Sequence, residues 1–226
     1  MKFGIPGSLQ HTLDIMAFTL FVLMVGRIGT LELAATNIVI SINSLAFMPS
    51  MGASQGISVL VGQALGRNNP NQANSYVWSA AHLLLIYTIS LDLLFIFAPD
   101  MMLAPFISSN TTLADQAIIL ELGRGLLHIV AAYLLFDAMY MMFSGALKGA
   151  GDTRFMMKAM ILISLFCFML PVFIGIQFLH IGLFSAWMLA FFYIFSLFVA
   201  FAWRYRLGAW KEMLVIETAP KNPQTD

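Results

Sequence analysis

Two aspartates stand inside long apolar stretches of the sequence, where a charge is unexpected. Asp14 lies in the apolar run 5–26, and Asp137 lies in the run 121–147. If these runs cross a membrane, each carboxylate costs about 2.5–3.5 kcal/mol or more unless it is paired, protonated or hydrated. Removal from water favours the protonated form, and such residues usually face a bundle interior or a wet cavity. We therefore predict that Asp14 and Asp137 bind a cation or a proton.

The neighbours of the two aspartates on the helix surface suit a flat lipophilic cation. Aromatic faces attract positive charge, and methionine packs adaptably against irregular ligands. A simpler alternative is that each aspartate hydrogen-bonds a neighbouring helix and only holds the packing. We favour the binding role, because carboxylates at mid-membrane depth are usually functional. The residues that share these faces are Gln10, Phe18 and Phe21 with Asp14, and Tyr133, Tyr140, Met141 and Ser144 with Asp137.

The residues alone allow either H⁺ or Na⁺ as the bound ion. A proton needs one carboxylate, whereas Na⁺ needs several oxygens, which Asn43, Ser41 or the backbone could add to Asp14 and Asp137. No cofactor is expected. His82 and His128 are isolated within their runs, so we predict no metal site other than one for Na⁺.

One further motif raises the alternative that the protein is an enzyme, which we do not favour. Gly149-Ala-Gly-Asp152 spells the Gly-x-Gly-Asp of intramembrane aspartyl proteases, which need two aspartates at matching depth. Asp152 is followed by Thr-Arg-Phe-Met-Met-Lys, which is typical of a loop at the membrane surface. Asp152 and Asp137 would then lie at different depths, so we do not expect catalysis.

The composition shows that these residues belong to a membrane protein. Of the 226 residues, 60% are hydrophobic and 10% are charged, against about 25% charged in soluble domains. The mean hydropathy is +0.87. Eleven basic and eleven acidic residues give no net charge, which removes the electrostatic case for binding nucleic acid. We predict an all-α integral membrane protein.

Six runs are long and apolar enough to cross a bilayer as helices of about 20 residues. The second run, 33–66, is charge-free over 34 residues, or about 51 Å of helix at ~1.5 Å per residue, and must bend or protrude. Pro49, Gly52 and Gly56 mark the easiest place for a bend, and the pair Gly145 and Gly149 suggests close helix packing. The six predicted runs are 5–26, 33–66, 76–98, 121–147, 156–177 and 181–203.

The loop charges predict the orientation. With the N-terminus in the cytoplasm, nine basic residues fall on the inner side and only Arg27 and Arg124 on the outer side. Both termini are therefore expected in the cytoplasm. We assign residues 1–206 to a transmembrane domain and 207–226 to a cytoplasmic tail, disordered from 215. The nine inner residues are Lys2, Arg67, Lys148, Arg154, Lys158, Arg204, Arg206, Lys211 and Lys221.

Two motifs resemble those of a known transporter family. Residues 52–66 read Gly-Ala-Ser-Gln-Gly-Ile-Ser-Val-Leu-Val-Gly-Gln-Ala-Leu-Gly, and residues 144–154 read Ser-Gly-Ala-Leu-Lys-Gly-Ala-Gly-Asp-Thr-Arg. They resemble the NorM-like branch of the multidrug and toxic compound extrusion (MATE) family, over residues 4–205. Members have two six-helix lobes, and this chain resembles the second lobe alone. The resemblance implies that Asp14, in place of the usual Glu, and Asp137 belong to the cation site.

The resemblance implies antiport: H⁺ or Na⁺ enters across the inner or plasma membrane while a small lipophilic organic cation leaves. Family members hold their substrate between the two lobes, so this chain would need the missing first lobe or a second copy of itself. Two alternatives stay open, an inactive or incomplete fragment of a split transporter and a flippase for lipid-linked substrates. The flippase alternative is disfavoured, because no Lys or Arg lies at mid-membrane depth.

Overall fold

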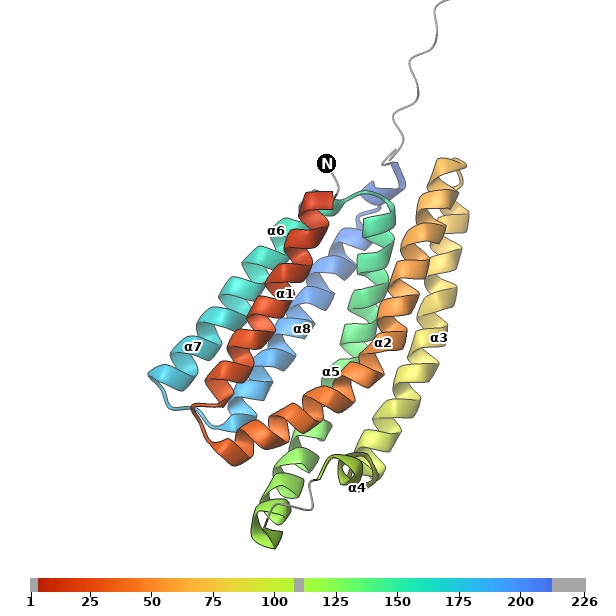
Figure 1. The fold of residues 1–226 in the computed structure, drawn as a ribbon. Helices are drawn as coiled ribbons and strands as arrows, with labels where there is room; N and C mark the ends of the chain where they lie inside the picture. The colour runs from red at the N-terminus through yellow and green to blue at the C-terminus, as the bar shows by residue number, and fades with distance from the viewer. Residues whose placement is uncertain (1–3, 108–111, 213–226) are drawn as a thin grey trace, which may run out of the picture.

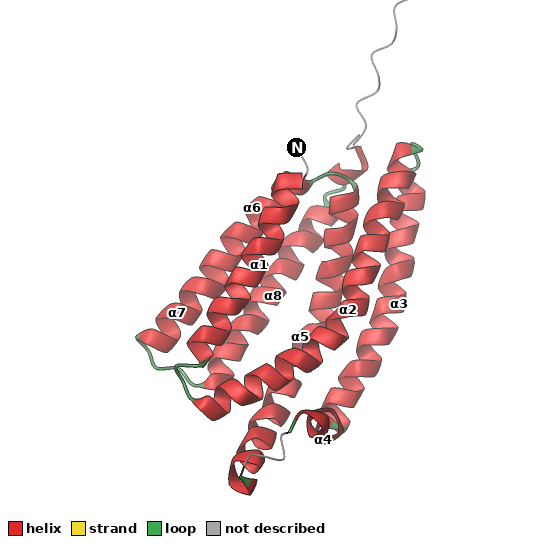
Figure 2. Cartoon of the chain, in the orientation of Figure 1, coloured by secondary structure: helices red, strands yellow, loops and turns green. Residues whose placement is uncertain are grey.

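The computed structural model describes residues 4–107 and 112–212, and side chains over 15–107 and 112–211. The described residues form helices linked by short turns, with no strand among them (Figure 2). The tail from 215 onward, predicted to be disordered, lies outside the described residues. The long helices are α1 (Gly4–Val25), α2 (Thr30–Gly66), α3 (Pro70–Phe97), α5 (Leu113–Gly149) and α8 (Leu183–Arg206). Shorter elements are α4 (Pro99–Leu103), α6 (Thr153–Ile163) and α7 (Leu170–Gln177), with 3₁₀ turns at Ala104–Phe106 and Ala209–Glu212.

Local sequence signals set the helix starts. Asn69 accepts a hydrogen bond from the backbone N–H of Gln72 (3.1 Å), and Pro70 fills the first helical position of α3. Thr112 accepts from the backbone N–H of Asp115 (3.2 Å) at the start of α5. The capped helix α5 begins eight residues before the predicted run 121–147, because a polar first turn can stay helical when a cap satisfies its N–H groups.

The fifth predicted span is one continuous rod built from three elements. A π-helix at Ser164–Met169 joins α6 to α7, and Pro171 lies in the first turn of α7. A proline removes one backbone donor, which a π-helical turn accommodates by shifting the hydrogen-bond register. The chain turns after Gln177 and enters α8 at Leu183, confirming that the uncharged stretch 159–203 holds two helices.

The central helix of the bundle is α5, which packs against α2, α3 and α8. Apart from the short α4, which contacts α3 and α5, the remaining helices form two sides: α2 and α3 on one, and α1, α6, α7 and α8 on the other (Figure 1). Helix α2 bends partway along its length and crosses from the α1 side to the α3 side (Figure 1). Pro49 lies within this helix and supplies a physical cause for the bend.

Five helices are long and apolar enough to cross a membrane, among the residues whose side chains are described. They are α2, α3, α5, α8 and the rod Thr153–Gln177; α1 contributes the shorter apolar stretch Ile15–Val25, since its side chains are described only from Ile15. The core of the bundle is apolar, with Trp187 at 2% exposure donating a hydrogen bond to the buried Thr36 hydroxyl (3.3 Å). The predicted all-α membrane fold is confirmed.

Candidate functional site

The site is built on Asp137, which lies on the central helix α5. Its side chain is 8% exposed and therefore buried among the helices. Tyr133 and Ser144, on the same helix face, are also buried, at 3% and 7% exposure. A carboxylate held at this burial interacts with protein groups instead of bulk water, so its charge state depends on what occupies its surroundings.

Tyr140 shares the Asp137 side of α5 but takes part in core packing. Its hydroxyl donates to the Met160 sulfur at 3.7 Å, and its ring meets the Phe201 ring edge-to-face at 5.0 Å. These contacts tie α5 to α6 and α8. The predicted ligand role of Tyr140 stays a prediction, and its described contacts give it a packing role as well.

Two glycines set how closely α2 approaches α5. A Cβ at Gly145 would lie 2.4 Å from the Ser54 carbonyl oxygen, and one at Gly149 would lie 2.3 Å from the Ser58 carbonyl oxygen. The Ser54 hydroxyl also donates to the Met141 carbonyl oxygen at 2.8 Å. Because Gly145 faces Ser54 and Gly149 faces Ser58, residue numbers rise together along the contact, so α2 and α5 run in the same direction here. Their backbones lie in contact.

The exposed side of α2 carries polar and small residues instead of a uniformly apolar surface. A Cβ at Gly52 or Gly56 would meet no neighbouring atom within 4 Å, so these glycines do not mediate packing among the described residues. We call the exposed polar and glycine positions the α2 stripe: Asn37, Ser41, Ser44, Gly52, Gln55 and Gly56. A stripe of this kind suits water or another protein surface better than lipid.

Asn43 lies next to the α2 stripe and is half-buried. Its side-chain carbonyl oxygen is buried without a hydrogen-bond partner among the described residues. A buried amide oxygen without a hydrogen bond costs free energy, and it can also coordinate a cation. Asn43 precedes Ser54 by 11 residues and Asp137 precedes Gly145 by 8, so Asn43 lies about one helical turn farther than Asp137 from the contact between these parallel helices.

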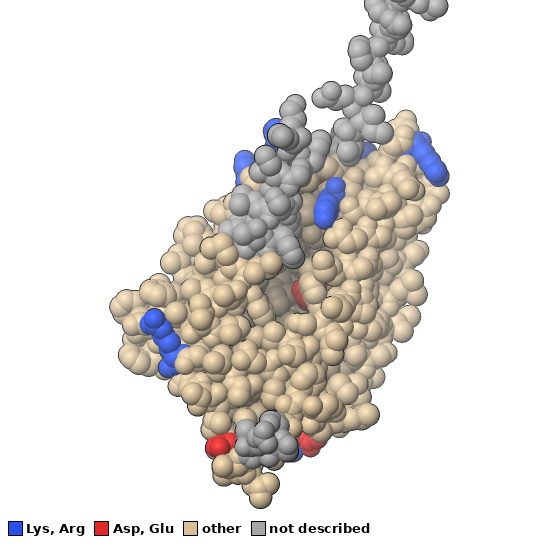
Figure 3. All heavy atoms as spheres, viewed as in Figure 1, with Lys and Arg blue, Asp and Glu red and all other residues tan. Residues whose placement is uncertain are grey.

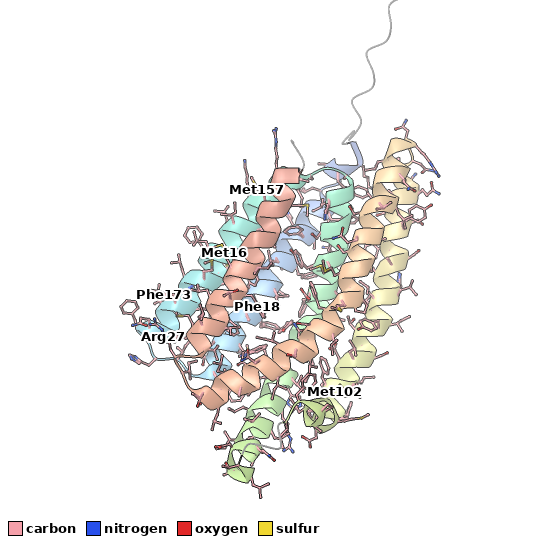
Figure 4. The ribbon with its side chains drawn as sticks, viewed as in Figure 1. Met16, Phe18, Arg27, Met102, Met157 and Phe173 are labelled. Carbon is pink, nitrogen blue, oxygen red and sulfur yellow. The ribbon has the colours of Figure 1, made fainter. Side chains whose placement is uncertain are left out.

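A hollow opens in the face on which α1 and α2 lie, and an acidic side chain is visible at its base (Figure 3). Helix α1 packs on α2, on α6, on α7 and on the π-helix between them. Phe18, 39% exposed, lies on the side of α1 that borders this region (Figure 4). Phe21 is buried, and its ring meets the Trp187 ring with 5.7 Å between centroids. The side chains of Asp14 and Gln10 lie outside the described set, so their predicted roles stay predictions.

Asp92 is a residue that sequence reasoning passed over. One of its carboxylate oxygens is buried in α3 without a hydrogen-bond partner among the described residues. The sequence could have identified Asp92, because an aspartate within the apolar run 76–98 carries a desolvation cost like that of Asp137.

Comparison with known proteins agrees with this architecture. The MatE family model matches residues 6–174. The chain is 30% identical over 153 residues to a probable multidrug resistance protein NorM of Brucella suis, covering 68% of this chain and 32% of that protein. It is 30% identical over 169 residues to a probable NorM of Pasteurella multocida, covering 74% and 34%. The chain thus spans about a third of the length of these relatives.

Solved structures share the fold over most of the chain. A MOP superfamily transporter from Pyrococcus furiosus superposes with a TM-score of 0.80 at 20% identity, covering 93% of this chain and 46% of that one. A eukaryotic MATE transporter superposes equally well, with a TM-score of 0.80 at 18% identity and the same coverage. The fold therefore corresponds to about half of those transporters. With its apolar helices and its match over residues 6–174, this chain belongs to the MatE family of integral membrane transporters.

Proposed function

We propose that the chain forms one lobe of a cation-coupled efflux transporter, in which H⁺ or Na⁺ enters as a small lipophilic organic cation leaves. The observation that carries the proposal is the buried Asp137 on the central helix α5. A buried carboxylate can hold a coupling ion or a cationic substrate, but two positive ligands at one carboxylate compete. That competition couples the two fluxes, and different affinities in inward-open and outward-open states give the direction.

A second lobe would cover the α2 stripe. In a single lobe this stripe would face lipid, where its polar groups would cost free energy. A partner lobe, or a second copy of this chain, would enclose it and the hollow near α1 in a cleft. The relatives and solved structures, two to three times longer than the matched part, support an arrangement with more than this one lobe.

The charge distribution supports placement in the cell membrane with both termini in the cytoplasm. The ends of α2, α5 and α8 and the start of α6 lie together at one end of the bundle (Figure 1). Most of the visible Lys and Arg side chains gather at that end (Figure 3). An excess of basic residues on the cytoplasmic side is the usual pattern in membrane proteins. The same distribution disfavours a flippase for anionic carriers, which needs cations nearer the middle.

The proposal predicts that cells lacking their own multidrug pumps accumulate less of a fluorescent cationic dye when they express this chain. We expect accumulation to fall at least about twofold relative to empty vector, and dissipating the H⁺ or Na⁺ gradient to restore it. Membrane abundance is measured in parallel. Unchanged accumulation despite normal abundance would contradict function by copies of this chain alone and would favour the incomplete-fragment alternative.

A further inference from the structure

A small pocket lies at the end of the bundle where the Lys and Arg side chains gather. Its volume is about 190 Å³, below the ~300–1,000 Å³ of pockets for drug-sized ligands. It is therefore suited to a small polar group. The residues that matter for its chemistry come from α3, from the end of α8 and from the segment that follows: Asn74, Trp78, Tyr205, Arg206, Trp210 and Lys211.

A tight reversal after α8 builds one wall of the pocket. Gly208 has φ of +73°, a backbone conformation that favours glycine, and it lets the chain fold back on the helix end. Trp210 is 1% exposed and stacks on Tyr205 with 4.9 Å between ring centroids. Its indole N–H donates to the Tyr205 carbonyl oxygen at 2.9 Å. Packing thus fixes Trp210, and Lys211 follows it directly in the chain.

Two positive charges in this pocket have no counter-charge among the described side chains. Arg204, two residues before Arg206, pairs with the buried Asp152 at 2.7 Å and stacks over the Phe155 ring, 5.2 Å from its centroid. No described carboxylate lies within ion-pair distance of Arg206 or Lys211. Lys211 Nζ lies 5.8 Å from the Trp210 ring centre. The lining of the pocket therefore includes two basic residues that no described carboxylate neutralises.

A neutral donor completes the set. The Tyr205 hydroxyl donates to the Asn74 side-chain oxygen at 2.7 Å, which orients the amide. The Asn74 amide nitrogen has no hydrogen-bond acceptor among the described residues and is left to donate to a ligand. Two basic side chains and an amide N–H donor are the kinds of group that bind phosphate oxygens.

We propose that this pocket binds the phosphate headgroup of an anionic phospholipid of the surrounding bilayer. Basic pockets between membrane helices on the cytoplasmic side recognise such headgroups. Trp78, 46% exposed, lines the pocket, and Trp203, 61% exposed, lies one turn before the end of α8. Exposed tryptophans favour the membrane–water interface, so the pocket opens at headgroup level. The inference does not depend on transport by the chain.

The test is lipid-dependent thermal stability of the purified full chain in a neutral detergent. Dioleoyl phosphatidylglycerol is expected to raise the unfolding temperature saturably, whereas dioleoyl phosphatidylcholine and inorganic phosphate are not. The double variant Arg206→Gln/Lys211→Gln is expected to need about 25-fold more phosphatidylglycerol for half the effect, at about fivefold for each charge. The matched control Arg67→Gln/Lys158→Gln removes two exposed charges from the same end, outside the pocket, and is expected to behave as the parent.

Three results would overturn the proposal. Equal stabilisation by phosphatidylcholine would show that headgroup charge is not recognised, and equal stabilisation by inorganic phosphate would assign the pocket to a free anion. An equal loss in the Arg67→Gln/Lys158→Gln control would show diffuse surface charge in place of a site. If the pocket double variant does not purify folded, the single change Lys211→Gln at an exposed position is made instead. It is expected to raise the phosphatidylglycerol concentration needed for half the effect about fivefold.

Discussion

Replacing Asp137 with Asn is expected to abolish ion-dependent dye efflux, lowering its rate at least about tenfold, with unchanged abundance in the membrane. The amide keeps the approximate size and one acceptor oxygen of the carboxyl group but can neither carry the negative charge nor exchange a proton. Asp137 is 8% exposed on the central helix, so bulk water has little access to the position. The measurement is dye efflux from preloaded cells after a gradient of H⁺ or Na⁺ is imposed.

The matched control for this variant is Asp115→Asn, the same change in the first turn of the same helix. Asp115 accepts a hydrogen bond from the Thr112 hydroxyl at 2.7 Å and lies six turns from Asp137. We expect the control to keep parental efflux. If Asp137→Asn keeps it as well, Asp137 has no part in coupling, and its burial reflects packing alone.

The second large effect is expected from the contact between α2 and α5. Introducing leucine at both Gly145 and Gly149 places side-chain atoms where backbone carbonyl oxygens of α2 already lie, at 2.4 and 2.3 Å from the ideal Cβ positions. Backbone atoms of a packed helix cannot rotate away as a side chain can. Overpacking costs about 1–3 kcal/mol at each site and more where backbone must move. The double variant is expected to lose the folded, monodisperse peak in size-exclusion chromatography after extraction in mild detergent.

The chain offers a matched control for this variant in Gly52 and Gly56, which repeat the same spacing on α2. A Cβ at either position meets no atom within 4 Å. The double change Gly52→Leu/Gly56→Leu is expected to leave the chromatographic peak in place. Equal loss in both double variants would show that leucine harms these helices for reasons other than contact. Reduced dye efflux in the folded Gly52→Leu/Gly56→Leu variant would fit a second lobe that lies against the α2 stripe.

The helices could be predicted from the sequence because a lipid environment imposes a simple rule. Charge-free runs of about 20 residues must be helical, since every backbone group needs a partner inside the span. This reasoning located both ends of α1, α2 and α8 to within about three residues. It missed the first turns of α3 and α5, before residues 76 and 121, where the Asn69 and Thr112 caps support polar helix ends. It also missed the π-helical register shift at Ser164–Met169.

The site could be predicted only in part. A carboxylate in an apolar run identified Asp137, because its cost is visible in the sequence alone. Packing partners were less visible, since periodicity gives a helix face but not the helix that covers it. The pairs Gly145/Gly149 and Gly52/Gly56 share the Gly-x-x-x-Gly spacing, yet a Cβ would meet the α2 backbone at the first pair and nothing within 4 Å at the second. The unsatisfied Asn43 oxygen likewise emerged only from the three-dimensional packing.

The central claim is that the α2 stripe faces a wet, cation-binding cleft and not lipid. Its most direct test is labelling of single cysteines by a membrane-impermeant maleimide, in a Cys167→Ser background and in intact membranes. Ser44→Cys lies on the stripe, and Leu83→Cys lies on the apolar surface of α3, where Leu83 is 70% exposed. We predict that Ser44→Cys is labelled, that a lipophilic organic cation slows this labelling, and that Leu83→Cys stays unlabelled. Equal labelling of the two positions, or no labelling of Ser44→Cys, would contradict the claim.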